Sequence, residues 1–295
     1  MKIVRPSLID DAALITSSAT ETVALWNSGT TYALGDQVRD DTEHKIYESL
    51  QASNTNHLVS DTAWWFEVGP TNRWAMFDEK INTVTTGATG LDVAIQPTGR
   101  VDTLALLNID AASVHVTAID GADGVIFDQT YSMVSDSGIT DWYAYFYEPI
   151  LRKTDLIITD IPLYNAPGIT VSLDAAGSPV SAGVLIVGQA KDIGSTAYGA
   201  SIGITDYSRK EADAFGNYTI VERAFSRKGS FRLMVDGGLV DEVARFLSSY
   251  RATPALYIGA DDYTSTAIYG FFRDFNIEIA YPTTSFCSLE IEGLT

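Results

Sequence analysis

The segment from residue 25 to residue 78 constrains the fold more than any other part of the chain. It contains four of the five tryptophans, Trp26, Trp64, Trp65 and Trp74. Most of the residues between them are Gly, Asn, Asp and Thr, which favour turns. A segment this short cannot bury a large aliphatic core, so its aromatic rings have to supply the core. We therefore predict a small module in which tryptophan serves both the interior and the binding surface.

The strands of this module are expected to be short. The sequence predicts them at residues 37–38, 45–50 and 64–68, with turn residues such as Gly29 between them. The order of its motifs resembles that of the type 3 chitin-binding modules, which are small β domains that bind carbohydrate. The resemblance covers about a sixth of the chain and rests on Trp26, residues 29–32 (GTTY), residues 35–36, Val38, Tyr47, Asn54, Trp64 and Trp65.

This resemblance implies that exposed aromatic rings of the module bind sugar. The candidates are Tyr32, Tyr47, Trp64 and Trp65, because the C–H face of a pyranose lies flat on an aromatic ring. The competing interpretation is that most of these rings form the core of the module. We expect Trp26 and one of Trp64 and Trp65 to lie in that core. The module could equally dock on a neighbouring protein.

The rest of the chain is predicted to be β-rich and divided into three further parts. Residues 1–24 form an N-terminal arm with a short helix at residues 7–13, which Ser7 can cap. Residues 25–80 form the module. Residues 81–174 contain short strands at regular spacing, typical of an antiparallel sandwich or jelly roll. These strands are expected at residues 101–109, 113–120, 125–131, 156–161 and 169–173.

The last part, residues 175–295, is predicted to be a β-rich domain that contains one helix at residues 239–251. Val240, Val243, Leu247 and Tyr250 fall on one face of that helix. The predicted fold class is therefore mainly β: a small aromatic-rich module, an antiparallel sandwich-like or jelly-roll-like body, and one helix in the C-terminal part.

The charge of the chain limits its partners. It has 38 Asp and Glu against 19 Lys and Arg, a net charge of -19. Nucleic-acid-binding proteins concentrate cations that displace phosphate counterions, so we expect no nucleic-acid partner. The excess of acid is interpreted as a source of solubility.

The cysteine content and the hydropathy of the chain indicate the compartment in which it folds. The single cysteine, Cys287, cannot form an intramolecular disulfide and is expected to be a small buried hydrophobe. Pro6 and Asp10 interrupt any signal-peptide core near the N-terminus. The longest uncharged run, residues 175–190, is too short to span a bilayer. We therefore predict folding in a reducing cytoplasm without membrane insertion.

No catalytic, metal or cofactor constellation is predicted. Residues 199–203 match the GxSxG pattern, but that pattern needs a histidine later in the chain, and all three histidines precede Ser201. They are His44, His57 and His115. Acidic turns at residues 120–123 and 261–262 lack the spacing of a calcium loop. We therefore expect that the chain is not an enzyme and that it needs no cofactor.

A cluster of basic residues stands out against the acidic chain. It is interpreted either as solvated strand and loop positions or as a contact patch for an acidic protein. Its members are Arg209, Lys210, Arg223, Arg227, Lys228 and Arg232.

Three further stretches resemble tailed-phage structural proteins. They are residues 68–80, 199–231 and 257–294. This resemblance implies a virion component, made in the bacterial cytoplasm and placed in the tail as a minor tail, tail-tip or fibre-adaptor protein. Its partners would be other virion proteins, further copies of itself and host-surface glycans. The alternatives are a free carbohydrate-binding protein, an accessory module of a polysaccharide-degrading system, or a depolymerase.

Overall fold

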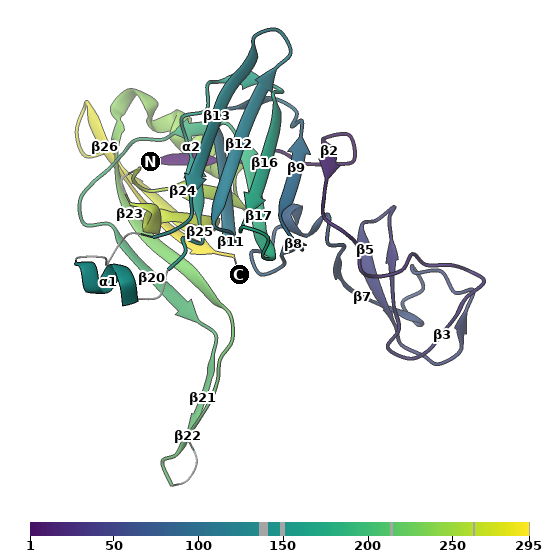
Figure 1. Cartoon of the computed structure of the whole chain (residues 1–295). Coiled ribbons are helices and arrows are strands. Elements are labelled where there is room, and N and C mark those ends of the chain that lie inside the picture. The colour runs from purple at the N-terminus through teal and green to yellow at the C-terminus, as the bar shows by residue number, and fades with distance from the viewer. Residues whose placement is uncertain (136–140, 148–150, 213–214, 262, 295) are drawn as a thin grey trace.

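The computed structural model describes residues 1–135, 141–147, 151–212, 215–261 and 263–294 (Figure 1). It is mainly β, with antiparallel sheets and a helix near the C-terminus, which confirms the predicted fold class. A body of three packed β-sheets carries the small N-terminal module at one side and a long hairpin at another.

The first half of the body is a β-sandwich. Its two sheets have the strand orders β13-β12-β16-β9-β2 and β14-β11-β17-β8. Apolar residues alternate along the strands; on β12, for example, Val114, Val116 and Ala118 are buried. The strands are β2 (Leu14–Ser17), β8 (Thr85–Gly87), β9 (Leu91–Ile95), β11 (Thr103–Asp110), β12 (Ser113–Asp120), β13 (Gly124–Ser132), β14 (Leu156–Ile158), β16 (Gly168–Asp174) and β17 (Val180–Gly188).

The second half is one large antiparallel sheet. Its order is β18-β1-β24-β25-β26-β23-β19, and β20 also pairs with β23. The 3₁₀ turn η2 (Gly237–Leu239) leads into helix α2 (Val240–Ser249), which packs Val243 and Leu247 on the sheet. The strands are β1 (Lys2–Val4), β18 (Ala190–Asp192), β19 (Ser195–Thr196), β20 (Ser201–Asp206), β23 (Phe225–Asp236), β24 (Ala255–Ile258), β25 (Ala267–Glu278) and β26 (Thr284–Gly293).

The two halves share a continuous apolar interface. Side chains of β11 and β17 that point away from the sandwich core, such as Leu107 and Ile186, pack on Leu256 and Tyr269 of the large sheet. Burial on both faces explains why β17 is apolar along nearly its whole length. β17 is a central strand of the sandwich, so the boundary that we predicted at residue 175 falls inside that sandwich.

The N-terminal residues do not form a separate arm. β1 lies in the large sheet, between β18 and β24, whereas β2 lies at the edge of the sandwich. The helix predicted at residues 7–13 is also wrong. The Asp10 carboxylate accepts hydrogen bonds from the backbone N–H groups of Ala12 and Ala13 and forms a turn that leads directly into β2. Aspartate competes with a helix in this way.

The module contains two small sheets. One has the order β4-β5-β7 and the other pairs β3 with β6. The three predicted strands are thus present with shifted ends. The bounds are β3 (Thr31–Tyr32), β4 (Gln37–Asp40), β5 (Lys45–Ser49), β6 (Asn54–Thr55) and β7 (Trp65–Pro70).

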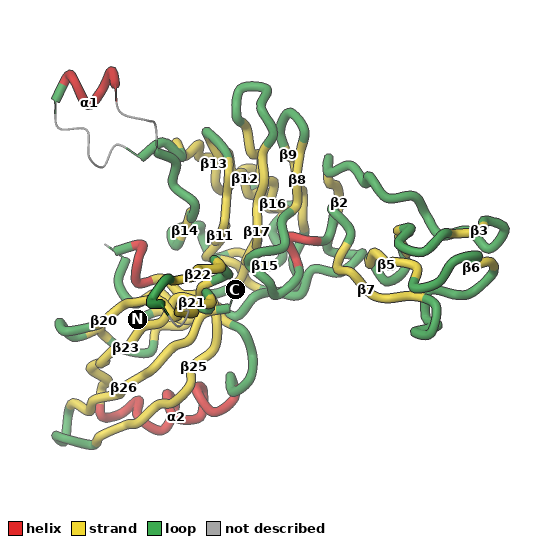
Figure 2. Tube along the Cα trace, turned by 90° about the horizontal axis from the view of Figure 1, so that it is seen from below, coloured by secondary structure: helices red, strands yellow, loops and turns green. Residues whose placement is uncertain are grey.

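A hydrogen-bonded clasp joins the module to the sandwich, from which it stands apart in Figure 2. The Asn72 side chain donates to the carbonyl oxygens of Thr20 and Thr86, at 3.0 and 2.9 Å, and accepts from Thr86 N–H. The Glu21 carboxylate accepts from the N–H groups of Asn72 and Arg73. The chain segments that enter and leave the module are therefore held together at their base. The 3₁₀ turn η1 (Ala75–Phe77) follows and packs Met76 into the sandwich core.

Short elements complete the described structure. They are β10 (Arg100–Val101), β15 (Tyr164–Asn165), β21 (Arg209–Ala212), β22 (Tyr218–Val221), α1 (Trp142–Tyr147) and η3 (Thr264–Thr266).

Candidate interaction surfaces

Three of the four aromatic residues that we proposed for sugar binding lie in the core of the module. Tyr32, Tyr47 and Trp65 are each at most 8% exposed and pack together with Val38. The rings of Tyr32 and Trp65 meet edge to face, with 5.3 Å between centroids. These three rings are therefore unable to stack on a sugar, and their assignment as binding residues is wrong. A module with few aliphatic residues uses them as its core.

His57 organises the tryptophans of the module. Its carbonyl oxygen accepts hydrogen bonds from the indole Nε1 of both Trp26 and Trp65, at 3.1 and 3.0 Å. Its imidazole stacks on the indole of Trp64, with 3.7 Å between centroids. We expected one of Trp64 and Trp65 to lie in the core of the module, and that residue is Trp65. Trp26 packs against the same core. Trp64 remains half-buried, with one face covered by His57.

The outer face of the β4-β5-β7 sheet presents an exposed ring that the sequence analysis missed. Phe66 is 59% exposed and lies opposite Glu48, which in turn lies opposite Gln37. The Gln37 amide donates to the Glu48 carboxylate at 3.1 Å. An aromatic ring beside an amide and a carboxylate can stack on a sugar and bind its hydroxyl groups. Strand alternation was the available signal, because burying Trp65 turns Phe66 outward.

A groove of about 510 Å³ lies where the module meets the sandwich. Trp74 and Phe77 contribute its apolar surface, and the imidazole of His44 stacks on Trp74 with 4.1 Å between centroids. His44 also pairs with Asp11, at 3.1 Å. The acidic residues lining the groove are Asp10, Asp11, Glu43, Glu67 and Asp78. Lys45 and Lys80 also line the groove, and Lys45 pairs with Glu67 at 2.8 Å.

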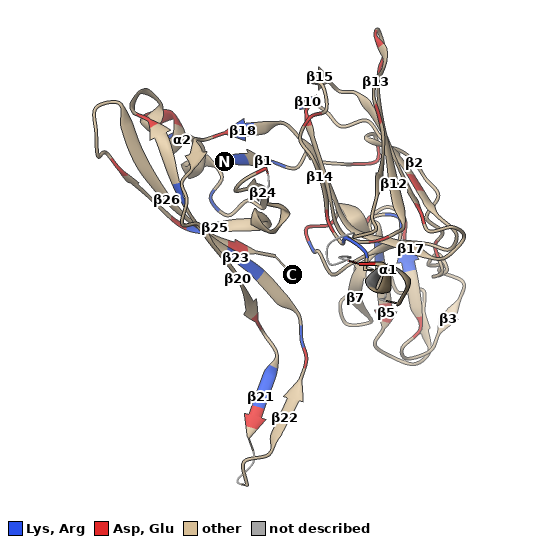
Figure 3. Ribbon diagram, turned by 60° about the vertical axis from the view of Figure 1, so that its left-hand side comes forward, with Lys and Arg blue, Asp and Glu red and all other residues tan. Residues whose placement is uncertain are grey.

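The basic cluster does not form one continuous patch. Its members lie on β21, on β23 (Figure 3) and, for Arg223, between β22 and β23, and four of the six form ion pairs within the described residues. The pairs are Arg209–Glu211, Lys210–Asp206, Arg227–Asp155 and Arg232–Glu278. Two hydrogen bonds, from the side chain of Lys210 and from Ser208, hold the pKa of Asp206 well below its ordinary value. Arg223 and Lys228 have no ion-pair partner in the described part of the chain.

The most conspicuous surface is a hairpin arm made of β20, β21, β22 and the first part of β23. It extends from the large sheet into solvent, as Figure 1 shows. Every residue of β21 and β22 is exposed. The arm nevertheless carries many large apolar side chains with exposures from 45% to 91%: Ile202, Ile204, Tyr207, Phe215, Tyr218, Ile220, Val221 and Phe225.

Helix α1 is a second exposed aromatic segment. The sequence analysis did not single it out. Trp142, Tyr143, Phe146 and Tyr147 are all strongly exposed. Trp142 lies near Phe146, and Tyr143 near Tyr147, as the spacing of four residues in a helix requires.

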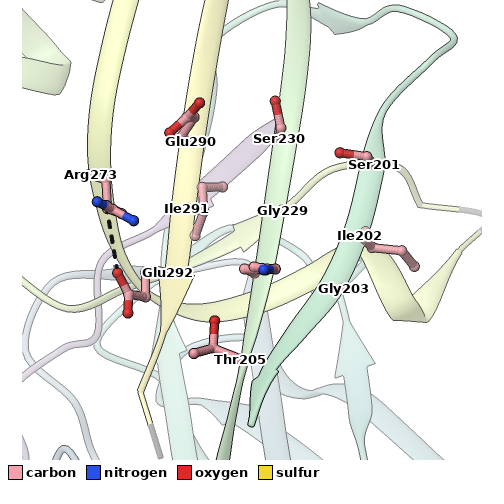
Figure 4. A pocket seen from close by; sticks show the side chains of 11 residues that line it. Ser201, Ile202, Gly203, Thr205, Gly229, Ser230, Arg273, Glu290, Ile291 and Glu292 are labelled. Carbon is pink, nitrogen blue, oxygen red and sulfur yellow. Dashed lines mark ion pairs between the residues drawn. The ribbon is translucent and has the colours of Figure 1, made fainter.

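Ser201 of the GxSxG match lines a shallow pocket on the large sheet (Figure 4). Ser201 is the first residue of β20 and is followed by a β-ladder with β23 and not by a helix, so the strand-turn-helix elbow that the motif requires is not formed here. The residues that line the pocket with it include Arg273, which pairs with Glu292, and no histidine. His57 and His115 instead pair with Asp61 and Asp128 respectively.

The remaining candidate sites have local structural roles. Asp120 accepts hydrogen bonds from the N–H groups of Ala122 and Asp123, and Asp261 pairs with Lys2. Residue 262, the other half of the second acidic turn, lies outside the described residues. Within the described ranges, no group of three or more His, Cys, Asp or Glu is placed to hold a metal ion. Nor does any helix there have the length and hydropathy to cross a membrane. Cys287 is buried as expected, which raises its pKa to about 11.

No protein-family model matches this chain, and a search of curated proteins finds no match. The resemblances to chitin-binding modules and to tailed-phage proteins therefore remain predictions from the sequence. Function has to be argued from the surfaces described above.

Proposed function

We propose that the chain is a non-enzymatic structural component of a phage tail, as a minor tail, tail-tip or fibre-adaptor protein. It binds other virion proteins through its body and arm, and its module contacts glycans of the host surface. The resemblance of residues 68–80, 199–231 and 257–294 to virion proteins supports the tail assignment.

The observation that carries the assembly part of the proposal is the hairpin arm. Isolated two-stranded hairpins are only marginally stable in water, and contiguous exposed apolar surface marks interaction sites. Tyr218 and Ile220 are 71% and 66% exposed on such a hairpin. An arm of this kind gains stability when it is buried against another protein.

The tail assignment is tested by the composition of particles. Virions of the phage or prophage that encodes the chain are purified, and their proteins are quantified by mass spectrometry. We expect the chain in a fixed ratio to other tail proteins, and gold-labelled antibodies at the tail in electron micrographs. Its absence from particles would contradict the assignment. A secreted, particle-free form that binds chitin beads would favour the alternative of a free carbohydrate-binding protein.

The exposed ring of Phe66 favours glycan contact by the module. The full chain is applied to a glycan array together with the Phe66→Ala variant. We expect binding of at least one glycan and a loss of about fivefold in the variant, since stacking on an aromatic ring contributes on the order of 1 kcal/mol. Leu34→Ala, on an exposed residue elsewhere on the module, is the control. Binding that is the same in all three proteins would exclude Phe66 as the contact.

A further inference from the structure

We infer that the hairpin arm docks on the acidic body of a second copy of this chain. The proposed function requires only that the arm bind a protein. This inference names the protein, and it holds whether or not the chain is part of a virion.

The distal part of the arm has an exposed face that carries two large apolar side chains, Tyr218 and Ile220. The register of β21 and β22 places Ala212 opposite Tyr218 and Lys210 opposite Ile220, so these four side chains lie on the same face of the ribbon. All four are exposed. In the described structure β21 and β22 pair only with each other, which leaves their outer edges open to another chain.

Charge identifies the surface that fits the arm. Residues 201–230 hold five of the 19 basic side chains and four of the 38 acidic ones, so the rest of the chain holds 14 basic and 34 acidic side chains. A weakly basic arm thus extends from a strongly acidic body. Arg223 and Lys228, the two members of the basic cluster without an ion-pair partner in the described residues, both lie in the arm. The acidic surface that complements it is the body of another copy.

Contact between an arm and a body is heterologous, because two different surfaces meet. Such contacts repeat from copy to copy and produce a ring when the rotation closes, or a helical array when it does not. Within one copy the arm points away from the body (Figure 1), and Tyr218 and Ile220 are 71% and 66% exposed there. The arrangement therefore predicts self-association through arm–body contacts, which two copies can also satisfy reciprocally by exchanging arms about a two-fold axis.

Sedimentation equilibrium of the full chain tests the inference. We expect self-association that weakens as sodium chloride is raised from about 50 mM to about 500 mM, because salt screens the contact between arm and body. The variant Tyr218→Ser/Ile220→Thr should associate at least tenfold more weakly. Its secondary structure is checked by circular dichroism.

The turn between β25 and β26 offers a matched control. Ile279 and Tyr281 there have the same two side-chain types at the same spacing, and they are 77% and 62% exposed. The variant Ile279→Thr/Tyr281→Ser should associate like the unmodified chain. Equal weakening by both variants would show that exposed apolar surface in general, and not the arm, drives association. A chain that stays monomeric at low salt and high concentration would also overturn the inference.

A photo-crosslinker maps the receiving surface. Tyr218 is replaced by p-benzoylphenylalanine, and ¹⁴N-labelled and ¹⁵N-labelled proteins are mixed before irradiation. We expect crosslinked peptides of mixed isotope composition that join the arm to acidic segments of the body. Crosslinks within one copy only, or between two arms only, would overturn the inference. Because the virion assignment is tested on purified particles, the two proposals can fail independently.

Discussion

The module and the hairpin arm use aromatic side chains in opposite ways. The module is the richest aromatic segment of the chain, yet Tyr32, Tyr47 and Trp65 are buried in its own core. The arm is less conspicuous in the sequence, yet Tyr218 and Ile220 are exposed to solvent. Aromatic density therefore indicates how a small domain is stabilised. Apolar side chains on an element with no core beneath them are the better sign of a binding surface.

The strongest test of this contrast is Trp65→Ala. Trp65 is 2% exposed, so its removal leaves a cavity, and the His57 carbonyl oxygen keeps only the hydrogen bond from Trp26. We expect a loss of about 3–5 kcal/mol, sufficient to unfold the module. Hydrogen exchange should show lost protection in β4, β5 and β7, with β11 and β17 unchanged. Full protection of the module in this variant would show that Trp65 is not its core.

The module and the large sheet should lose stability differently as the pH becomes alkaline. Burial raises the pKa of Tyr257 and of Cys287 in the sheet to about 12 and about 11 respectively. In the module, burial and the nearby Glu43 raise the pKa of Tyr47 to about 12. Unfolded chains lose these protons first as pH rises, near pH 9 for cysteine and pH 10 for tyrosine. Stability therefore falls from about pH 9 upward, by about 1.4 kcal/mol per group for each unit of pH between its two pKa values.

Burial also raises the pKa of Tyr269 on β25, so the sheet has three such groups and should weaken earlier than the module, which has one. Urea unfolding between about pH 8 and pH 11 checks this, with two probes. Tryptophan fluorescence reports mainly on the module, and the reaction of Cys287 with a thiol reagent reports on the sheet. Tyr47→Phe should remove the module's alkaline loss and leave that of the sheet. If the module lost stability at a lower pH than the sheet, the alkaline loss could not come from these buried tyrosine and cysteine groups.

Some of this contrast was predictable from the sequence. The apolar period of α2 placed Val243 and Leu247 on the sheet, and alternation placed most strands. Sheet partners were not predictable, because they are distant in sequence: Lys2–Val4 pairs with both Ala190–Asp192 and Ala255–Ile258. For this reason the boundary at residue 175 and the N-terminal arm were wrong. In the hairpin arm, Ile202 and Ile204 of β20 alternate with other residues as on a half-buried strand, so the exposure of both faces was hidden until the partners were known.

Asn72→Ala tests whether the module is held to the body by its clasp. The variant loses the bonds from Asn72 to Thr20 and Thr86, at an expected cost of about 2 kcal/mol. The module should remain folded but move more freely. Limited proteolysis should then cut residues 18–24 and 70–80 faster, while tryptophan fluorescence stays unchanged. Asn276→Ala, at an exposed position of β25, is the control. Unchanged cleavage would mean that the groove contacts of His44 and Trp74 hold the module instead.

The smallest effect is expected for the stability of the arm variant, because the arm's apolar side chains are exposed whereas those of the module are buried. In Tyr218→Ser/Ile220→Thr both side chains are already in water, so their loss removes almost no buried surface. We expect the free energy of unfolding of the isolated chain to change by less than about 0.5 kcal/mol. Urea denaturation at a concentration below that of self-association measures it. The same variant at high concentration should lose the stabilisation that association provides. A loss of about 2 kcal/mol or more at low concentration would mean that the arm packs on its own body, and the division between a buried module and an exposed arm would no longer hold.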